Sequence, residues 1–308
     1  MVMGNSVNLS VDIGGVIWKN PVTVASGTFG SGKEYGEYVD LSKLGAITTK
    51  GVSPTPWAGN VVPRVAETYG GMLNSIGLQN FGVDSFIETD MPFLREQNTV
   101  VIVNVCGHKI SEYCEVARKL TEAGGADMLE LNISCPNVSE GGMAFGTNWK
   151  MTEKVVSEVK KVTNLPLIAK LSPNVTDIDV IAKAAEGAGA DALSLINTVM
   201  GMKIDIKTRK PVLGNKIGGL SGPAIKPVAI RCVYQVASSN VKIPIIGMGG
   251  ITTGEDAIEF ILAGASAVAV GTANFINPKA TLDVIEGISK YMEDNNINDV
   301  KELIGKAL

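Results

Sequence analysis

The chain has 308 residues, which is enough for one large barrel or two small domains, and its formal net charge is −4. This acidic balance argues against nucleic-acid binding, which requires a basic patch. We find no apolar run long enough to span a bilayer and no signal-peptide pattern over residues 1–12, so the expected protein is cytoplasmic and has no membrane association.

The cysteines and the single histidine narrow the chemistry further. Cys106, Cys114, Cys135 and Cys232 form neither a CxxC pair nor a disulfide-rich pattern, which is typical of a reducing, cytoplasmic setting. With His108 as the only histidine, a His-based zinc site or a Ser-His-Asp triad is poorly supported. We therefore predict no metal site.

The N-terminal part of the chain predicts a β-hairpin followed by a core strand. Residues 9–13 and 16–18 flank Gly14-Gly15, a typical two-residue hairpin turn. The apolar residues 21–26 then predict the first core strand.

Residues 27–34 come close to the phosphate-binding pattern GxxxxGK[ST]. Glu34 stands where that pattern needs a hydroxyl for Mg²⁺, and its carboxylate would repel phosphate, so we expect no nucleoside triphosphate there. A flexible turn leading into a helix over residues 34–44 is the preferred interpretation.

The rest of the chain alternates between short apolar strands and helices. Eight strands are predicted at residues 21–26, 46–50, 100–105, 128–133, 167–170, 192–197, 243–247 and 267–271. Helices are predicted at residues 111–123, 152–162, 177–188, 225–236, 255–262 and 279–292, with Thr152 as the N-cap of the second.

This alternation predicts an α/β fold, a (β/α)₈ TIM barrel with an N-terminal β-hairpin. A doubly wound open sheet, the alternative, would have fewer strands and a dinucleotide fingerprint on its first turn, which is absent. No linker divides the chain, so residues 1–308 are expected to form a single domain. Residues 51–80, rich in Gly, Pro and Asn, predict a long functional loop inserted at the C-terminal face of the barrel.

Polar residues collect where the predicted strands end, which is where such barrels place their active sites. They are Ser26, Lys50, Asn104, Asn132, Cys135, Lys170, Asn197, Thr198, Gly249, Gly250, Gly271 and Thr272. Glycine turns after the last two strands predict a phosphate site. Two lysines at the same end of the barrel require an anionic ligand, unless one of them loses its charge. A phosphate-tailed heterocycle such as FMN fits this set.

Residues 130–137 (ELNISCPN) form the most distinctive stretch. Cys135 follows a buried strand and stands between Asn132 and Asn137, so it is a candidate for proton transfer. The alternative is an inert buried thiol. Glu130 shares a strand face with Asn132, so we expect it inside the barrel, paired with one of the strand-end lysines. The alternative is that Glu130 faces the helices and finds its partner there.

Three motifs together identify a family resemblance. Residues 132–137 (NISCPN), 71–80 (GMLNSIGLQN) and 246–251 (IGMGGI) resemble class 1 dihydroorotate dehydrogenases over nearly the whole chain. Residues 64–68 (RVAET) resemble the B-type, NAD-linked catalytic subunit. The resemblance implies oxidation of (S)-dihydroorotate to orotate in pyrimidine synthesis, with hydride passing to one FMN per subunit and Cys135 as the general base.

The resemblance also implies roles for individual residues. The implied FMN contacts are Ser26, Lys50, Gly51, Asn104, Asn132, Lys170, Ile196, Gly222, Gly249, Gly250, Gly271 and Thr272. The implied substrate contacts are Lys50, Asn74, Ser75, Ile76, Gly77, Leu78, Asn132, Asn137, Asn197 and Thr198.

A partner is implied as well. The cysteines lack the spacing of a plant-type [2Fe–2S] cluster, and no GxGxxG opens a helix after a strand. The B-type resemblance implies a separate subunit that carries FAD and a [2Fe–2S] cluster, in a heterotetramer of two catalytic and two electron-transfer chains. Open alternatives are an A-type homodimer that reduces fumarate, a Schiff-base lyase or aldolase using Lys50 or Lys170, and a non-enzymatic flavin- or phosphate-binding module.

Overall fold

The fold is a barrel of eight parallel strands. A computed structural model describes residues 7–133, 139–140 and 143–308. The barrel strands are β3 (Val22–Val24), β4 (Ala46–Thr48), β7 (Val100–Val105), β8 (Met128–Asn132), β11 (Leu167–Lys170), β12 (Ala192–Leu195), β17 (Ile245–Met248) and β18 (Ala267–Val270). From β4 onward each strand pairs in parallel with the next, and β18 pairs with β3.

The first and second strands meet at a seam that closes the ring. Gly45 N donates to Val22 O at 3.0 Å just before β4 begins. Higher on the same two strands, the hydroxyls of Thr23 and Thr48 lie 3.2 Å apart. The predicted (β/α)₈ barrel is therefore confirmed.

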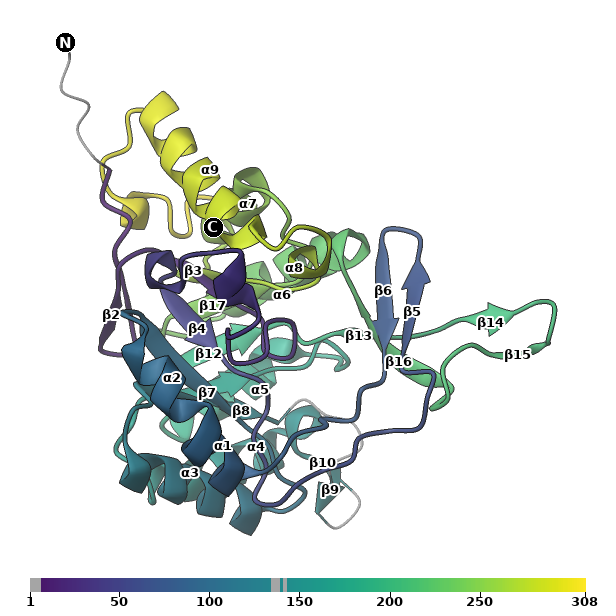
Figure 1. Ribbon diagram of the computed structural model, residues 1–308. Helices are drawn as coiled ribbons and strands as arrows, with labels where there is room; N and C mark the ends of the chain where they lie inside the picture. Colours follow the sequence, from purple (N-terminus) through teal and green to yellow (C-terminus); the bar gives the residue numbers. More distant parts are fainter. Residues whose placement is uncertain (1–6, 134–138, 141–142) are drawn as a thin grey trace.

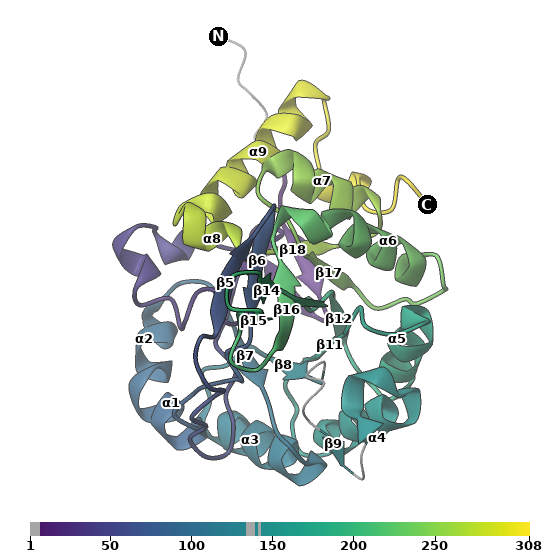
Figure 2. The same ribbon diagram turned by 90° about the vertical axis from the view of Figure 1, so that its right-hand side faces the viewer.

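Helices surround the barrel, as Figure 2 shows in a view along it. They are α1 (Val83–Thr89), α2 (Met91–Glu96), α3 (Ile110–Ala123), α4 (Trp149–Lys160), α5 (Ile178–Gly187), α6 (Lys226–Ala237), α7 (Gly254–Leu262), α8 (Ala273–Ile276) and α9 (Ala280–Asp294). Within the part of the chain that the structure describes, no helix combines the length and apolarity needed to cross a membrane.

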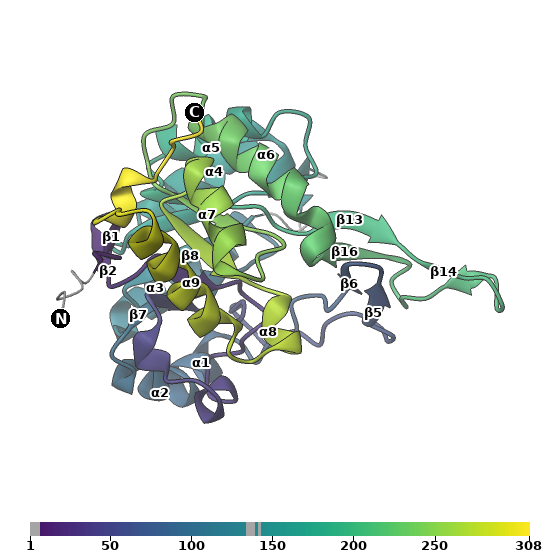
Figure 3. The same ribbon diagram turned by 90° about the horizontal axis from the view of Figure 1, so that it is seen from above.

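The expected N-terminal hairpin is present. Strands β1 (Val11–Ile13) and β2 (Val16–Trp18) pair antiparallel around the Gly14-Gly15 turn, and Ile13 and Trp18 are fully buried. In Figure 3 this hairpin lies at the opposite end of the molecule from the projecting arm described next.

Two insertions build a second, smaller sheet beside the barrel mouth. Its strands are β5 (Val65–Thr68), β6 (Gly71–Asn74), β13 (Val199–Met202) and β16 (Ile217–Ser221), in the order β13-β16-β6-β5. Between β13 and β16, strands β14 (Ile204–Asp205) and β15 (Lys210–Pro211) form an arm that projects away from the barrel (Figures 1 and 3). A further short pair, β9 (Ser139–Glu140) and β10 (Met143–Ala144), follows β8. The predicted long loop over residues 51–80 is thus partly an ordered hairpin, formed by β5 and β6.

Two local predictions were wrong. The expected helix over residues 34–44 is replaced by two single-turn 3₁₀ helices, Tyr35–Glu37 and Leu41–Lys43, because extended Asp40 caps the second of them through Ser42 N. The cap of α4 is Asn148, whose side chain accepts from two backbone N–H groups, whereas Thr152 lies inside the helix and donates to Phe145 O.

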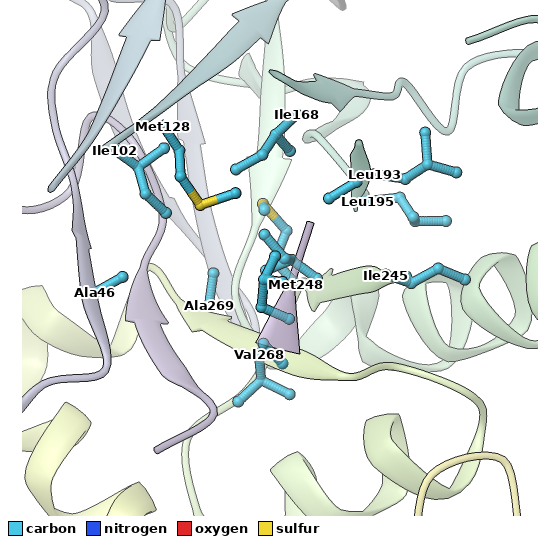
Figure 4. Close-up of a cluster of buried hydrophobic side chains, with 14 of the residues drawn as sticks. Ala46, Ile102, Met128, Ile168, Leu193, Leu195, Ile245, Met248, Val268 and Ala269 are labelled. Atoms are coloured by element: carbon cyan, nitrogen blue, oxygen red, sulfur yellow. The ribbon is translucent and has the colours of Figure 1, made fainter. Parts of the chain in front are cut away.

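An apolar layer fills the barrel below its polar mouth. Ile102, Met128 and Ile168 come from three successive strands, are fully buried and belong to the cluster drawn in Figure 4. Each precedes a polar residue of the same strand by two positions, so the two share a face. The polar residues above therefore rest on a packed floor.

The seam offers a test of the barrel's closure. A Cβ added at Gly45 would lie 2.0 Å from the backbone oxygen of Asn20, which no rotamer change relieves. Gly45→Ala should therefore lower the free energy of unfolding by about 3 kcal/mol or more, measured by urea titration. Gly187→Ala is the control, because its Cβ meets nothing within 4 Å, and it should leave stability unchanged or raise it by up to about 1 kcal/mol. Equal stability of the two variants would contradict the seam packing.

Candidate active site

A cavity opens at the carboxyl ends of the barrel strands. Its volume is about 600 Å³, within the range of about 300–1,000 Å³ that is common for small-molecule sites. The strand ends form its base and walls, and residues of β5, β6, β13 and β16 border it from the insertion side. The site therefore lies where this fold places its chemistry.

The predicted site residues that the structure describes all line this one cavity. They are Ser26, Lys50, Gly51, Asn74, Ser75, Ile76, Gly77, Leu78, Asn104, Asn132, Lys170, Ile196, Asn197, Thr198, Gly222, Gly249, Gly250, Gly271 and Thr272. Cys135 and Asn137 lie outside the described residues.

Two lysines lie in the cavity wall. Lys170 is 4 % exposed, and its Nζ donates to Ser26 Oγ at 3.0 Å. Burial lowers the pKa of Lys50, and the positive charge of Lys170 lowers it further, against an opposing contribution from Cys106. An anionic ligand in the cavity would offset both costs of keeping Lys50 charged.

The buried carboxylate of Glu130 lies inside the barrel, as predicted, but its partners differ from the prediction. It is 2 % exposed, accepts from Asn104 Nδ2 at 2.5 Å and accepts from Ser194 Oγ at 2.7 Å. Among the described residues, neither of its side-chain donors is a lysine. The expected Glu130–lysine pair was wrong, because two neutral donors occupy the carboxylate.

The glycine turns lie together at one end of the cavity. Gly249 and Gly250 have φ of +128° and +83°, and a Cβ on Gly250 would lie 2.9 Å from Gly222 O. Thr272, which directly precedes α8, donates its hydroxyl to Ser221 Oγ at 2.8 Å. Closely packed glycine backbone beside hydroxyls suits a phosphate ester, so this end of the cavity can accommodate a phosphate group.

The loop over residues 74–78 borders the cavity on the insertion side and is held from behind. Asn60 donates its backbone N–H to Ile76 O at 3.0 Å and its Nδ2 to Ser75 O at 3.2 Å. Ser75 N donates to Arg64 O at 2.8 Å. The buried Ser75 Oγ has no hydrogen-bond partner in the described structure, so a rotation about χ1 toward the cavity would cost it no hydrogen bond.

Sequence reasoning missed the residues that the small sheet and neighbouring loops contribute to the cavity. They are Asn60, Val65, Met72, Asn174, Met200, Asn215, Ile217, Gly218, Gly219 and Ser221, and Phe275 of α8 was missed as well. The signal was available, since residues 199–224 form an unassigned gap between a predicted strand and its helix. A gap of that length inside a compact domain indicates an insertion with its own structure.

The fold and the site define a (β/α)₈-barrel enzyme whose cavity suits an anionic, hydrogen-bonding ligand. The comparisons with known proteins agree and go further. A family model described as "Dihydroorotate dehydrogenase" matches residues 8–292. The chain therefore belongs to the dihydroorotate dehydrogenase family of oxidoreductases.

Curated relatives place the chain within that family. It is 67 % identical over 97 % of its length to the "Dihydroorotate dehydrogenase B (NAD(+)), catalytic subunit" of Alkaliphilus metalliredigens, covering 98 % of that protein. The same description applies to a relative from Lachnoclostridium phytofermentans, 64 % identical over 97 % of this chain and 99 % of the relative. The resemblance to the B-type catalytic subunit is confirmed.

A solved structure supports the fold. The dihydroorotate dehydrogenase of Eimeria tenella, crystallised with ferulenol, superposes with a TM-score of 0.80 at 24 % identity, covering 99 % of this chain and 90 % of that one. At this identity the likeness supports the barrel architecture alone.

Proposed function

We propose that this chain is the FMN-binding catalytic subunit of an NAD-linked dihydroorotate dehydrogenase, which oxidises (S)-dihydroorotate to orotate in pyrimidine synthesis. The proposal rests on one observation: two lysines, several carboxamides and the glycine turns all line a single cavity. The chain's membership of the dihydroorotate dehydrogenase family supports it. The B-type relatives support the choice of NAD⁺ as the final acceptor.

The cavity's donor set fits FMN. Backbone at Gly249, Gly250 and Gly271 would hold the phosphate, while Lys170 and Asn104 would contact the ring. When bound, FMN supplies the acceptor for the hydride that leaves C6 of the substrate. The positive charges on the cavity wall favour an electron-rich ring beside them.

The substrate, a carboxylate-bearing dihydropyrimidine, would occupy the part of the cavity bordered by residues 74–78. Asn74 and Asn197 offer carboxamides, Lys50 offers positive charge, and Ser75 offers a free hydroxyl. Cys135, as a thiolate, would take the proton from C5 while the C5=C6 double bond forms. Asn132, Asn137 and Thr198 complete the proposed substrate contacts.

The electrons must then leave the protein. We propose that they pass to a separate subunit carrying FAD and a [2Fe–2S] cluster, in a heterotetramer of two catalytic and two electron-transfer chains. The relatives' description as a "catalytic subunit" supports the existence of such a partner.

Ser75→Ala tests the substrate site directly. Ser75 lines the cavity, and its hydroxyl is buried and has no partner in the described structure. If it bonds the anionic substrate, its loss should raise KM for dihydroorotate about tenfold to a hundredfold. FMN affinity and thermal stability should stay unchanged, since no protein hydrogen bond is lost.

Thr68→Val provides a matched control. Thr68 on β5 also carries a buried hydroxyl without a partner, but it does not line the cavity. Its KM should equal that of the unmodified protein. An unchanged KM in Ser75→Ala, or equal changes in both variants, would remove Ser75 from the substrate site.

A further inference from the structure

The carboxylate of Glu130 lies beneath the cavity without lining it. Asn104, its donor on β7, is its direct neighbour in the sheet register. Its other donor, Ser194, lies on β12, which is separated from β8 by β11. The bond to Ser194 therefore crosses the inside of the barrel. Burying a carboxylate there costs free energy that burying an apolar side chain would not cost. We therefore expect its hydrogen bonds to have a role that an apolar side chain could not fill.

An ionised carboxylate only accepts hydrogen bonds, so it dictates how Asn104 is oriented. The amide nitrogen of Asn104 must face Glu130, which turns Oδ1 the other way. Asn132 Nδ2 donates to that Oδ1 at 3.3 Å. Asn104 and Asn132 both line the cavity, so the buried carboxylate orients one carboxamide of the wall, and a second one bonds to the oxygen of the first.

The neighbouring glycine leaves this oxygen uncovered. A Cβ at Gly51, which also lines the cavity, would lie 3.0 Å from Asn104 Oδ1. The backbone of Asn104 is held as well, since its N–H donates to Thr49 Oγ1 at 3.3 Å and its carbonyl accepts from Val52 N at 2.8 Å. The remaining freedom is which of Nδ2 and Oδ1 of Asn104 faces Glu130, and the hydrogen bond from Nδ2 to Glu130 sets that orientation.

We propose that Glu130 is a positioning residue that makes the wall at Asn104 present a hydrogen-bond acceptor, so that the bound ring must offer an N–H group there. This inference rests on the proposed function, in which that ring belongs to FMN. The competing role for Glu130 is that of a negative charge that offsets Lys50 and Lys170. The two roles predict different behaviour when the charge is removed and the hydrogen bonds are kept.

Glu130→Gln and Glu130→Met separate the two roles. The introduced glutamine can accept from Asn104 Nδ2 through its oxygen and donate to Ser194 Oγ through its nitrogen, because a hydroxyl both donates and accepts. Glu130→Gln should therefore keep the equilibrium Kd for FMN within about threefold of the unmodified protein. Glu130→Met leaves Asn104 Nδ2 unpaired and its orientation unset, and FMN binding should weaken about tenfold or more.

A reversed pair tests the orientation even if Glu130→Met fails to fold. Asn104→Asp alone sets two carboxylates against each other and should weaken FMN binding at least about tenfold. In Glu130→Gln/Asn104→Asp, the introduced glutamine amide donates to one oxygen of the introduced aspartate, and the other oxygen takes the place of Asn104 Oδ1. The pair keeps its net charge, so most of the lost affinity should return.

The measurement is quenching of FMN fluorescence by the apoprotein, with thermal melting as the check on folding. Recovery in the double variant, together with near-normal binding by Glu130→Gln, supports the proposal. It is overturned if the double variant binds as weakly as Asn104→Asp, or if Glu130→Gln binds as weakly as Glu130→Met. Failure of the unmodified chain to bind FMN overturns the proposed function itself, which separates the two failures.

Discussion

Replacement of Cys135 by alanine is expected to slow reduction of bound FMN by dihydroorotate about 10²- to 10⁴-fold, the usual contribution of a positioned base. The thiolate would take the C5 proton, and alanine offers no group for it. FMN binding should be unchanged, because the proposed cofactor contacts come from other residues. Anaerobic single-turnover measurements of flavin absorbance give the rate directly.

The pH dependence of the same rate identifies the base. A free thiol has a pKa of about 8.5, so the rate should rise with pH until Cys135 is ionised. Cys114→Ala is the control, since Cys114 lies on α3 and does not line the cavity. An undiminished rate in Cys135→Ala would exclude the thiol from the mechanism.

The isolated chain, loaded with FMN, is expected to reduce no NAD⁺ above background when dihydroorotate is supplied. Co-expression with the electron-transfer subunit should restore NAD⁺ reduction at the rate of the intact enzyme. The reason is chemical, since the reduced cofactor needs a route out and the cysteine spacing of this chain does not fit a plant-type [2Fe–2S] cluster. Steady-state assays of both preparations at equal FMN content make the comparison.

Fumarate distinguishes the alternative assembly. A self-sufficient A-type homodimer would turn over with fumarate as fast alone as with a partner. Such turnover, or robust NAD⁺ reduction by the chain alone, would contradict the proposed two-subunit enzyme. Size and composition of the co-expressed complex, measured by light scattering, then test the proposed stoichiometry.

The barrel was predictable because its strands are short and apolar and recur at regular spacing between helices. Segments 100–105 and 267–270 carry that pattern almost without interruption. The failures fall where local chemistry competes with periodicity. Asp40 is the N-cap of a separate 3₁₀ turn, so the predicted helix does not continue through it. Asn148 is the N-cap of α4, which therefore begins before Thr152.

The position of the cavity was predictable because the carboxyl ends of barrel strands converge. Strand-end residues such as Lys50, Lys170 and Asn104 can therefore be placed together even when the loop structure is unknown. The partners of Glu130 were not predictable. Its bond to Ser194 skips a strand, and therefore depends on the stagger of the barrel, which strand positions alone do not supply. The small sheet at the cavity's border was missed because its strands are short and glycine-rich.

Anaerobic addition of dihydroorotate to the purified, FMN-loaded chain tests the central claim most directly. The account predicts that the visible flavin absorbance bleaches, with one orotate formed for each FMN reduced. A protein that stays colourless and inert when FMN is supplied, or a bound flavin whose spectrum dihydroorotate leaves unchanged, would contradict it.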